Sequence, residues 1–531
     1  MKKYNIGNNI NPTEVTDYDI HISPKDKFGV SYSSDGTRLI GIKEKKDFCS
    51  TEYHIIDGTK IICDEAFSGC SHISKIIIPD SVEIIGSWAF ANCRSLENIV
   101  FSNSLKTIKS FAFKDCKKLN NIVLPNTLES LGEMVFSYTN IKEIVLPYSL
   151  KEIEGNPITY NNVCFKSNSP HFIVEDNNLY NKGKKTILSF QSEKDSFIIP
   201  ETVETIGNYA FWYTKLNSIT ITPNVSRIGI NPFANIMGID FKFTNLSPHF
   251  HFENGLLITN DKKTLISCLS NTPIVILPLS ITTIAENAFC SKYITNCILH
   301  NKLKRINNWA FEGCKELTNI NLPNSIEYIG RAAFYRCSSL VSINIPPKIK
   351  CISRSLFYKC TSIRNIEIPL GVTKIDKYAF CHCHSLIDII IPSSVAIIEK
   401  SAFYGCRWLK SVFIPKSVKR IGYYAFSDCQ EVTIIRRGRS SYKQYSSMSL
   451  IATDIGNKER IQKMLPKYLH SIIKEQSLEH YIHEQDTIEE NTEIEEIYNN
   501  EGFERVKCPR CGDWYYVYSG VCDTCGYPWN E

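Results

Sequence analysis

The chain has 531 residues, with 60 basic and 55 acidic side chains and a formal net charge of +5. This charge is too small to argue by itself for nucleic-acid binding. No apolar run is long enough to span a membrane as a helix.

The first segment, residues 1–27, shows no hydrophobic period, and we expect it to form a cap or a loose tail. The opening MKKYNIGNNI has two lysines but no apolar stretch after them, so it predicts no secretory signal.

From about residue 56 to residue 435 a phenylalanine returns about every 23 residues. A period of this size indicates a stack of small units that cannot bury their apolar faces alone. The copies carry Phe67, Phe90, Phe113, Phe136, Phe211, Phe233, Phe289, Phe311, Phe334, Phe357, Phe380, Phe403 and Phe426.

The unit at 317–339 reads LTNINLPNSIEYIGRAAFYRCSS. Its first six residues alternate as in a half-buried strand, which Pro323 closes because proline lacks an N–H. The return segment points Ile326 and Ile329 inward. We expect Gly330 to turn the backbone with a positive φ, after which Phe334 enters the core.

This pattern, L-x-x-I-x-I-P followed by I/V-x-x-I-G and A-F-x-x-C, resembles the BspA-like leucine-rich repeats. The resemblance implies a mainly β repeat solenoid over residues 28–435, curved and with a ladder of parallel strands on one face.

A cysteine stands three residues after the repeat phenylalanine in nine units, at Cys70, Cys93, Cys116, Cys314, Cys337, Cys360, Cys383, Cys406 and Cys429. We interpret these thiols as small buried hydrophobes. The alternative is a set of disulfides or a metal array. Units without this cysteine are one residue shorter, as at 136–141, so the cysteine belongs to one local turn.

Three segments interrupt the period, near 28–45, 169–190 and 247–268. The last two match each other: an apolar strand, a turn rich in Asn, Gly or Asp, a lysine pair and a second apolar strand. We predict β-hairpin modules that act as variant turns of the stack. The alternative is an arm that contacts a partner.

After the repeats, residues 436–457 read as a basic, serine-rich linker. Residues 458–485 have amphipathic helix spacing and offer a cap for the open end of the solenoid. Residues 486–504 are acidic and are interpreted as a solvated tether.

The last segment, residues 505–531, carries two C-x-x-C knuckles, formed by Cys508, Cys511, Cys522 and Cys525. Four thiolates at this spacing predict one tetrahedral Zn²⁺. The segment resembles a small zinc ribbon. All four ligands are supplied by the chain, so the zinc is expected to be structural, and so small a domain needs it to fold.

The leading functional hypothesis is a scaffold that binds protein partners through the repeat face, with the ribbon as an accessory module. The predicted binding residues flank the central residue of successive strands: Asn319, Asn321, Ser342, Asn344, Asn365, Glu367, Asp388, Ile390, Ser411 and Phe413, with Trp408 nearby. Ile390, Phe413 and Trp408 form either a hot spot for a partner or a patch covered by the 458–485 helix.

Two other functions are considered. The ribbon and the basic residues Arg436, Arg437 and Arg439 suggest nucleic-acid association, but the acidic tether repels phosphate. A surface adhesin exported without a recognisable signal is the second. No catalytic motif is present, so we predict no enzyme. The thiols and the lack of a signal favour the cytoplasm.

Overall fold

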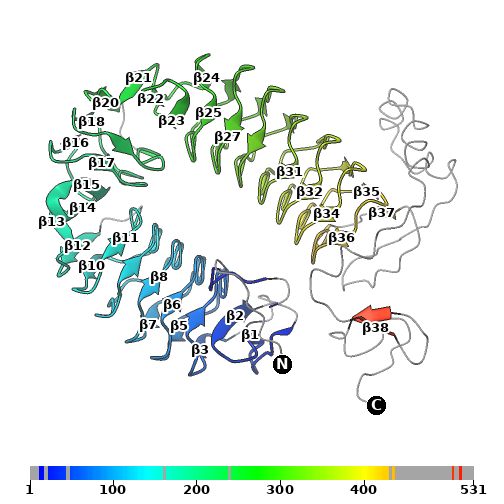
Figure 1. The fold of residues 1–531 in the computed structure, drawn as a ribbon, viewed down its shortest axis with the longest axis horizontal. Coiled ribbons are helices and arrows are strands. Elements are labelled where there is room, and N and C mark those ends of the chain that lie inside the picture. Colours follow the sequence, from blue (N-terminus) through cyan, green and yellow to red (C-terminus); the bar gives the residue numbers. More distant parts are fainter. Residues whose placement is uncertain are drawn as a thin grey trace. The chain divides into compact units, whose positions relative to one another are not determined.

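The computed structural model describes residues 11–16, 19, 22–42, 48, 50–159, 163–236, 241–429, 433–436, 505–507 and 514–516. The chain divides into two units, Met1–Asp454 and Ile455–Glu531. In the second unit the described residues form β38 (Arg505–Lys507) and β39 (Trp514–Tyr516), which pair antiparallel. The first unit holds the repeats (Figure 1).

The L-x-x-I-x-I segments form short strands that pair in parallel, one turn of the stack after another, as with Ile76 and Ile99. This first ladder contains β3 (Glu52–His54), β5 (Lys75–Ile77), β7 (Asn98–Val100), β10 (Glu143–Leu146), β12 (Cys164–Ser167), β16 (Ser196–Ile198), β18 (Ser218–Ile221), β20 (Lys242–Asn245), β24 (Ile274–Ile276), β26 (Asn296–Ile298), β28 (Asn319–Ile320), β30 (Ser342–Ile343), β33 (Asp388–Ile390), β35 (Ser411–Ile414) and β37 (Thr433–Arg436).

The return segments form a second parallel ladder, although the sequence suggested a ladder on one face only. Its two-residue strands are β4 (Ile61–Ile62), β6 (Ile84–Ile85), β8 (Thr107–Ile108), β9 (Ser130–Leu131), β11 (Glu152–Ile153), β17 (Thr205–Ile206), β19 (Arg227–Ile228), β25 (Thr283–Ile284), β27 (Arg305–Ile306), β29 (Tyr328–Ile329), β31 (Cys351–Ile352), β32 (Lys374–Ile375), β34 (Ile397–Ile398) and β36 (Arg420–Ile421). Many turns, such as those of β5 and β6, therefore bond to the next turn through both strands.

The three interrupting segments form antiparallel β structure: β1 (Val30–Tyr32) with β2 (Arg38–Ile42), then β13 (Phe172–Glu175), β14 (Asn178–Asn181) and β15 (Thr186–Ser189), then β21 (Phe250–Glu253), β22 (Leu256–Thr259) and β23 (Thr264–Cys268). A short 3-10 helix, Lys182–Lys184, joins β14 to β15. The last strand of each module then joins the second ladder in parallel.

Each of these modules also fills the place of the repeat phenylalanine. The amides of Ile42, Phe190 and Cys268 donate to the alanine carbonyls that precede Phe67, Phe211 and Phe289, as the amide of Phe67 donates to Ala89. Ile42, Phe190 and Cys268 are buried. The modules are thus full turns of the stack.

One turn escaped the sequence pattern because it carries isoleucine instead of phenylalanine. The amide of Phe136 donates to the Pro157 carbonyl at 3.0 Å, which places Ile158 next in the phenylalanine row. Ile158 is fully buried.

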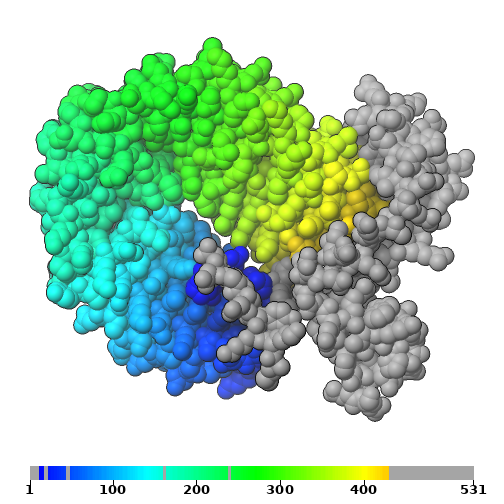
Figure 2. Space-filling model, viewed as in Figure 1, coloured from blue at the N-terminus to red at the C-terminus, as the bar shows by residue number. Residues whose placement is uncertain are grey.

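The repeat phenylalanines stack on one another through the core, as the sequence predicts. Phe403 and Phe426 have ring centroids 5.2 Å apart and planes within 3°. Phe311 and Phe334 are 5.3 Å apart. All thirteen are buried, and the turns pack closely along the stack (Figure 2).

The ladder cysteines are buried thiols, as predicted, but they are also hydrogen-bond donors. The Sγ of Cys360 lies 3.0 Å from the carbonyl oxygen of Phe334, one turn earlier, and Cys116 repeats this contact with Phe90 at 3.1 Å. The thiol therefore closes each turn on the preceding one, which explains why it stands at a fixed distance from the phenylalanine.

Gly330 was expected to turn the backbone with a positive φ, and this expectation is wrong. Its φ is not positive; instead, a Cβ at Gly330 would lie 2.5 Å from the amide nitrogen of Asn308 in the preceding turn. The left-handed residues of this turn are Ala332 (φ 56°) and Arg336 (φ 59°). Glycine is thus used at 330 for close approach of two backbones.

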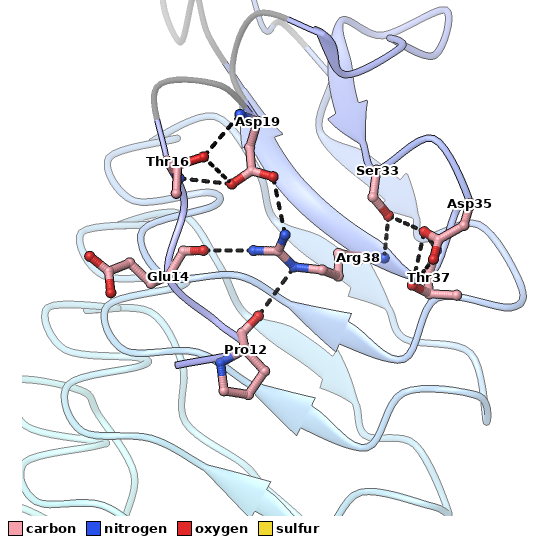
Figure 3. Close-up of polar contacts among 8 residues, drawn as sticks. All are labelled: Pro12, Glu14, Thr16, Asp19, Ser33, Asp35, Thr37 and Arg38. Carbon is pink, nitrogen blue, oxygen red and sulfur yellow. Dashed lines mark hydrogen bonds and ion pairs between the residues drawn. The ribbon is translucent and has the colours of Figure 1, made fainter. Parts of the chain in front are cut away.

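Residues 11–16 and Asp19 lie against the first turns (Figure 3). The guanidinium of Arg38 donates to the carbonyls of Pro12 and Glu14 and pairs with the Asp19 carboxylate at 3.1 Å. Thr13 is fully buried, and its carbonyl accepts a hydrogen bond from the amide of Asp64. Lys109 Nζ also donates to Asn11 Oδ1 at 2.6 Å, so this segment contacts several of the first turns and not only the terminal one.

Candidate binding surfaces

The outward positions of the first ladder hold the residues that the sequence proposed as a binding face. Six of them are exposed: Asn319, Asn321, Ser342, Asn344, Asn365 and Glu367. Ile390, Ser411 and Phe413 are half-buried. Trp408 is 66% exposed.

Asp388 does not point outward as expected, since it is only 6% exposed. Its carboxylate accepts a hydrogen bond from Ser411 Oγ at 2.5 Å. This contact joins two adjacent turns, so Asp388 contributes to the stack and is removed from the set of partner-facing residues.

Asn344 is exposed, yet its amide is already engaged by the stack. Its Oδ1 accepts from the amide of Leu322 at 2.8 Å, and its Nδ2 donates to the Leu322 carbonyl at 2.7 Å. Ser342 similarly donates to Asn319 Oδ1 at 2.9 Å. The polar middle of this face therefore satisfies much of its own hydrogen bonding.

The sequence interpretation missed three exposed aliphatic residues on the same face of successive turns, Val100, Val123 and Val145, which are 59%, 85% and 39% exposed. They occupy the same unit position as Asn321 and Phe413, so the repeat pattern could have found them in the earlier turns. Ile276 and Ile298, paired in register, repeat the feature at 67% and 47% exposure.

Ile390 and Phe413 are register partners in β33 and β35. The predicted 458–485 helix, which would cover these two residues and Trp408, lies outside the described residues. The linker at 437–457, the acidic tether and the zinc cysteines Cys508, Cys511, Cys522 and Cys525 also lie outside them.

A second surface, which the sequence interpretation did not single out, lies on the turns that carry the repeat phenylalanines. We call it the basic turn row and define it as Arg331, Arg336, Arg354 and Lys359. Arg336 is exposed and the other three are half-buried. Arg354 pairs with Glu65 at 2.5 Å.

Comparison with known proteins gives the family. The sequence profile described as "BspA type Leucine rich repeat region (6 copies)" matches residues 45–164, 158–240, 189–316, 263–360 and 310–433. The chain belongs to this BspA-type leucine-rich repeat family. Comparison with curated proteins found no match.

Solved structures of leucine-rich repeat proteins are similar to this BspA-type chain. One from Bacteroides ovatus is 22% identical over 80% of this chain and 97% of its own, with a TM-score of 0.31. A leucine-rich cell surface protein from Faecalibacterium prausnitzii is 21% identical over 79% and 95%, with a TM-score of 0.29. A T. pallidum leucine-rich repeat protein is 27% identical over 35% and 88%, with a TM-score of 0.32. At these scores the alignments carry no functional argument.

No helix in the described ranges has the length and apolar character that a membrane crossing requires.

Proposed function

We propose that this BspA-type repeat protein is a non-enzymatic scaffold that binds protein partners through the first ladder. The observation that carries the proposal is the exposure of Val123 (85%) and Val100 (59%) at equivalent positions of successive turns, where β7 ends at Val100 and the turn of Val123 continues the same face. Aliphatic side chains exposed in a row lose water on contact with a complementary surface, which favours association. The buried neighbours Leu119 and Leu124 hold the Val123 segment on the stack, so little further ordering is needed for binding.

A capture experiment with matched variants tests the proposal. Intact chain is compared with Val100→Glu/Val123→Glu, with Ile390→Glu/Phe413→Glu, and with Leu370→Glu, an exposed aliphatic residue outside the ladder. We expect cross-linked partners to be lost with one or both double variants and kept with Leu370→Glu. Partners that a chain ending at Gln485 loses but both double variants keep, and that nuclease treatment releases from the intact chain, would instead favour the ribbon and nucleic acid.

We further propose that Cys508, Cys511, Cys522 and Cys525 hold one structural zinc ion, because two C-x-x-C knuckles supply a closed set of four thiolates. Metal analysis of the purified chain should find one zinc per molecule, and Cys508→Ser/Cys511→Ser should remove it. Zinc that persists in this variant would contradict the proposal.

We propose the cytoplasm as the compartment. The buried ladder thiols and four zinc thiolates suit reducing conditions. Fractionation of native cells, with an antibody against the chain, tests this: protein accessible to protease on intact cells would favour the surface adhesin alternative.

A further inference from the structure

Four cations stand on two adjacent turns of the stack, on either side of the repeat phenylalanines. Arg331 and Arg354 precede the phenylalanine of their turns by three residues, and Arg336 and Lys359 follow it by two. Backbone hydrogen bonds hold the turns in register: Ala332 N donates to Arg354 O at 2.9 Å and Arg336 N to Tyr358 O at 2.8 Å. Equivalent residues are thus about 4.8 Å apart along the stack.

Aromatic rings position all four cations, and the Arg354 guanidinium lies 5.8 Å from the Tyr378 ring centroid. The Arg331 guanidinium lies 5.3 Å from the Trp309 ring centroid, Arg336 lies 5.3 Å from Tyr335, and Lys359 lies 5.5 Å from Tyr358. Tyr335 and Tyr358 stack at 4.8 Å. A ring face attracts a cation but accepts few of its N–H groups. The ring contacts therefore leave N–H donors for an oxygen ligand, apart from those that Tyr335 and Glu65 accept from Arg336 and Arg354.

Two of these donors lack an acceptor. In the described part of the chain, Nε of Arg331 and Nε of Arg354 are buried without a hydrogen-bond partner. A buried donor without an acceptor is costly and rare, and a ligand is one explanation for it. Burial, and then the charge of Arg354, lower the pKa of Arg331 to about 10.

Acidic groups near the row offset only part of its charge. Glu65 forms an ion pair with Arg354. The negative charge of Asp376 acts to raise the pKa of both Arg331 and Arg354. Glu312 acts on Arg336, but burial raises the pKa of Glu312, which favours its neutral form. These carboxylates would also repel an extended polyanion passing over the row.

The backbone of the repeat turn sets the direction of the outer pair. Arg336 and Lys359 adopt left-handed φ values of 59° and 58°, a conformation that Asn92, Asp115 and Gly405 share at the same position of other turns. The φ is thus a property of the turn, and it places both side chains at the same position of adjacent turns.

We propose that the basic turn row, Arg331, Arg336, Arg354 and Lys359, binds a phosphate monoester group. Guanidinium forks match phosphate oxygens in geometry and charge. The row spans two turns, which suits one phosphate group rather than a chain of them. The group is carried either by a phosphorylated side chain of a partner or by a small phosphate compound. The inference does not rest on the scaffold proposal.

Isothermal titration calorimetry with the full chain tests this site. The probes are inorganic phosphate, a phosphoserine peptide, its unphosphorylated counterpart and a single-stranded RNA homopolymer, at matched ionic strength. The variants are Arg331→Gln/Arg336→Gln and Arg336→Gln alone, which changes an exposed residue and keeps the test valid if the double variant does not fold. The control is Arg305→Gln, whose guanidinium lies 4.3 Å from the Tyr328 ring on the second ladder.

We expect phosphate or the phosphopeptide to bind and the unphosphorylated peptide to give no heat. Binding should weaken at least about tenfold in Arg331→Gln/Arg336→Gln, measurably in Arg336→Gln, and not in Arg305→Gln. Tighter binding of the phosphopeptide assigns a phosphorylated partner, and tighter binding of phosphate assigns a small compound. Absence of binding by both phosphate and the phosphopeptide, equal affinity in Arg336→Gln, or a preference for RNA would overturn the proposal.

Discussion

Arg354 Nη2 lies 2.5 Å from Glu65 Oε1, although 289 residues separate them in the chain. Most other ion pairs of the stack join side chains about one turn apart, as Lys106 and Glu83 do. The Glu65–Arg354 pair instead joins an early turn of the first unit to a late one. Both side chains are partly exposed, at 40% and 30%.

We expect a double-mutant cycle with Glu65→Gln and Arg354→Gln to give a coupling energy of up to about 1 kcal/mol, because the pair is partly solvated. The coupling should decrease in high salt. Chemical denaturation of the four proteins measures it. Glu83→Gln, combined with Arg354→Gln, is the control and should show no coupling. Equal coupling energies in the Glu65/Arg354 and Glu83/Arg354 cycles would show that the Glu65–Arg354 contact contributes nothing to stability.

The core phenylalanines should each contribute strongly to stability. Phe334 is fully buried and stacks on Phe311 at 5.3 Å and on Phe357 at 6.0 Å. Phe334→Ala should therefore cost about 3–5 kcal/mol in the free energy of unfolding. Urea denaturation followed by circular dichroism measures this loss. Val123→Ala, at an 85% exposed position, should change it little. A loss below that of Val123→Ala would refute the stacked core.

The ladder thiols should be chemically inert in the folded protein. Burial raises the pKa of Cys360, and its Sγ donates to the Phe334 carbonyl, so little thiolate forms. Cys164 is exposed. Iodoacetamide should label Cys164 quickly and Cys360 only after unfolding in urea, as measured by peptide mass spectrometry. Labelling of both at similar rates in native buffer would contradict the ladder.

Stability should depend on pH through Glu133, whose pKa is raised to about 7 by burial and then by Glu154 and Glu286, while a hydrogen bond from Asn208 lowers it. Below about pH 4.5 the carboxyl is protonated in both states. As the pH rises toward 7, the unfolded chain loses this proton first, so the folded state is progressively destabilised.

Glu133→Gln keeps an acceptor for Asn208 and removes the charge. We expect it to raise the free energy of unfolding at neutral pH by roughly 1–3 kcal/mol and to flatten its pH dependence above pH 4.5. Thermal melts at several pH values measure both effects. Glu129→Gln, which removes the exposed partner of Lys151, should not flatten the profile. Parallel profiles for wild type and Glu133→Gln would exclude this role.

The phenylalanine and cysteine rows were predictable because each turn repeats one chemical task. Phe334 fills the core of its turn, and the Cys360 thiol joins the next turn to it through the Phe334 carbonyl. Because every turn needs both contacts, the same residue types recur. Ile158 was missed because isoleucine performs the task of phenylalanine without preserving the letter. The second ladder was missed because its strands are only two residues long, as at Ile84–Ile85.

The candidate surfaces were predictable only in part. The alternation of apolar and polar residues indicates which strand residues can point outward, and it correctly predicted that Asn319 and Glu367 are exposed. It could not indicate that Asp388 would be buried against Ser411, since the two belong to different turns. The basic turn row escaped notice for the same reason: Arg331 and Arg354 are 23 positions apart in the sequence and neighbours only in the stack.

The sequence by itself determined the turn of this protein: its length, its strand, its core phenylalanine and its thiol, because these depend on contacts within one turn or with the next. The tertiary structure alone decided which surface charges meet, as with Glu65 and Arg354. Such contacts depend on how small rotations between turns accumulate along the stack. The accumulated rotation cannot be predicted from any local pattern of residues.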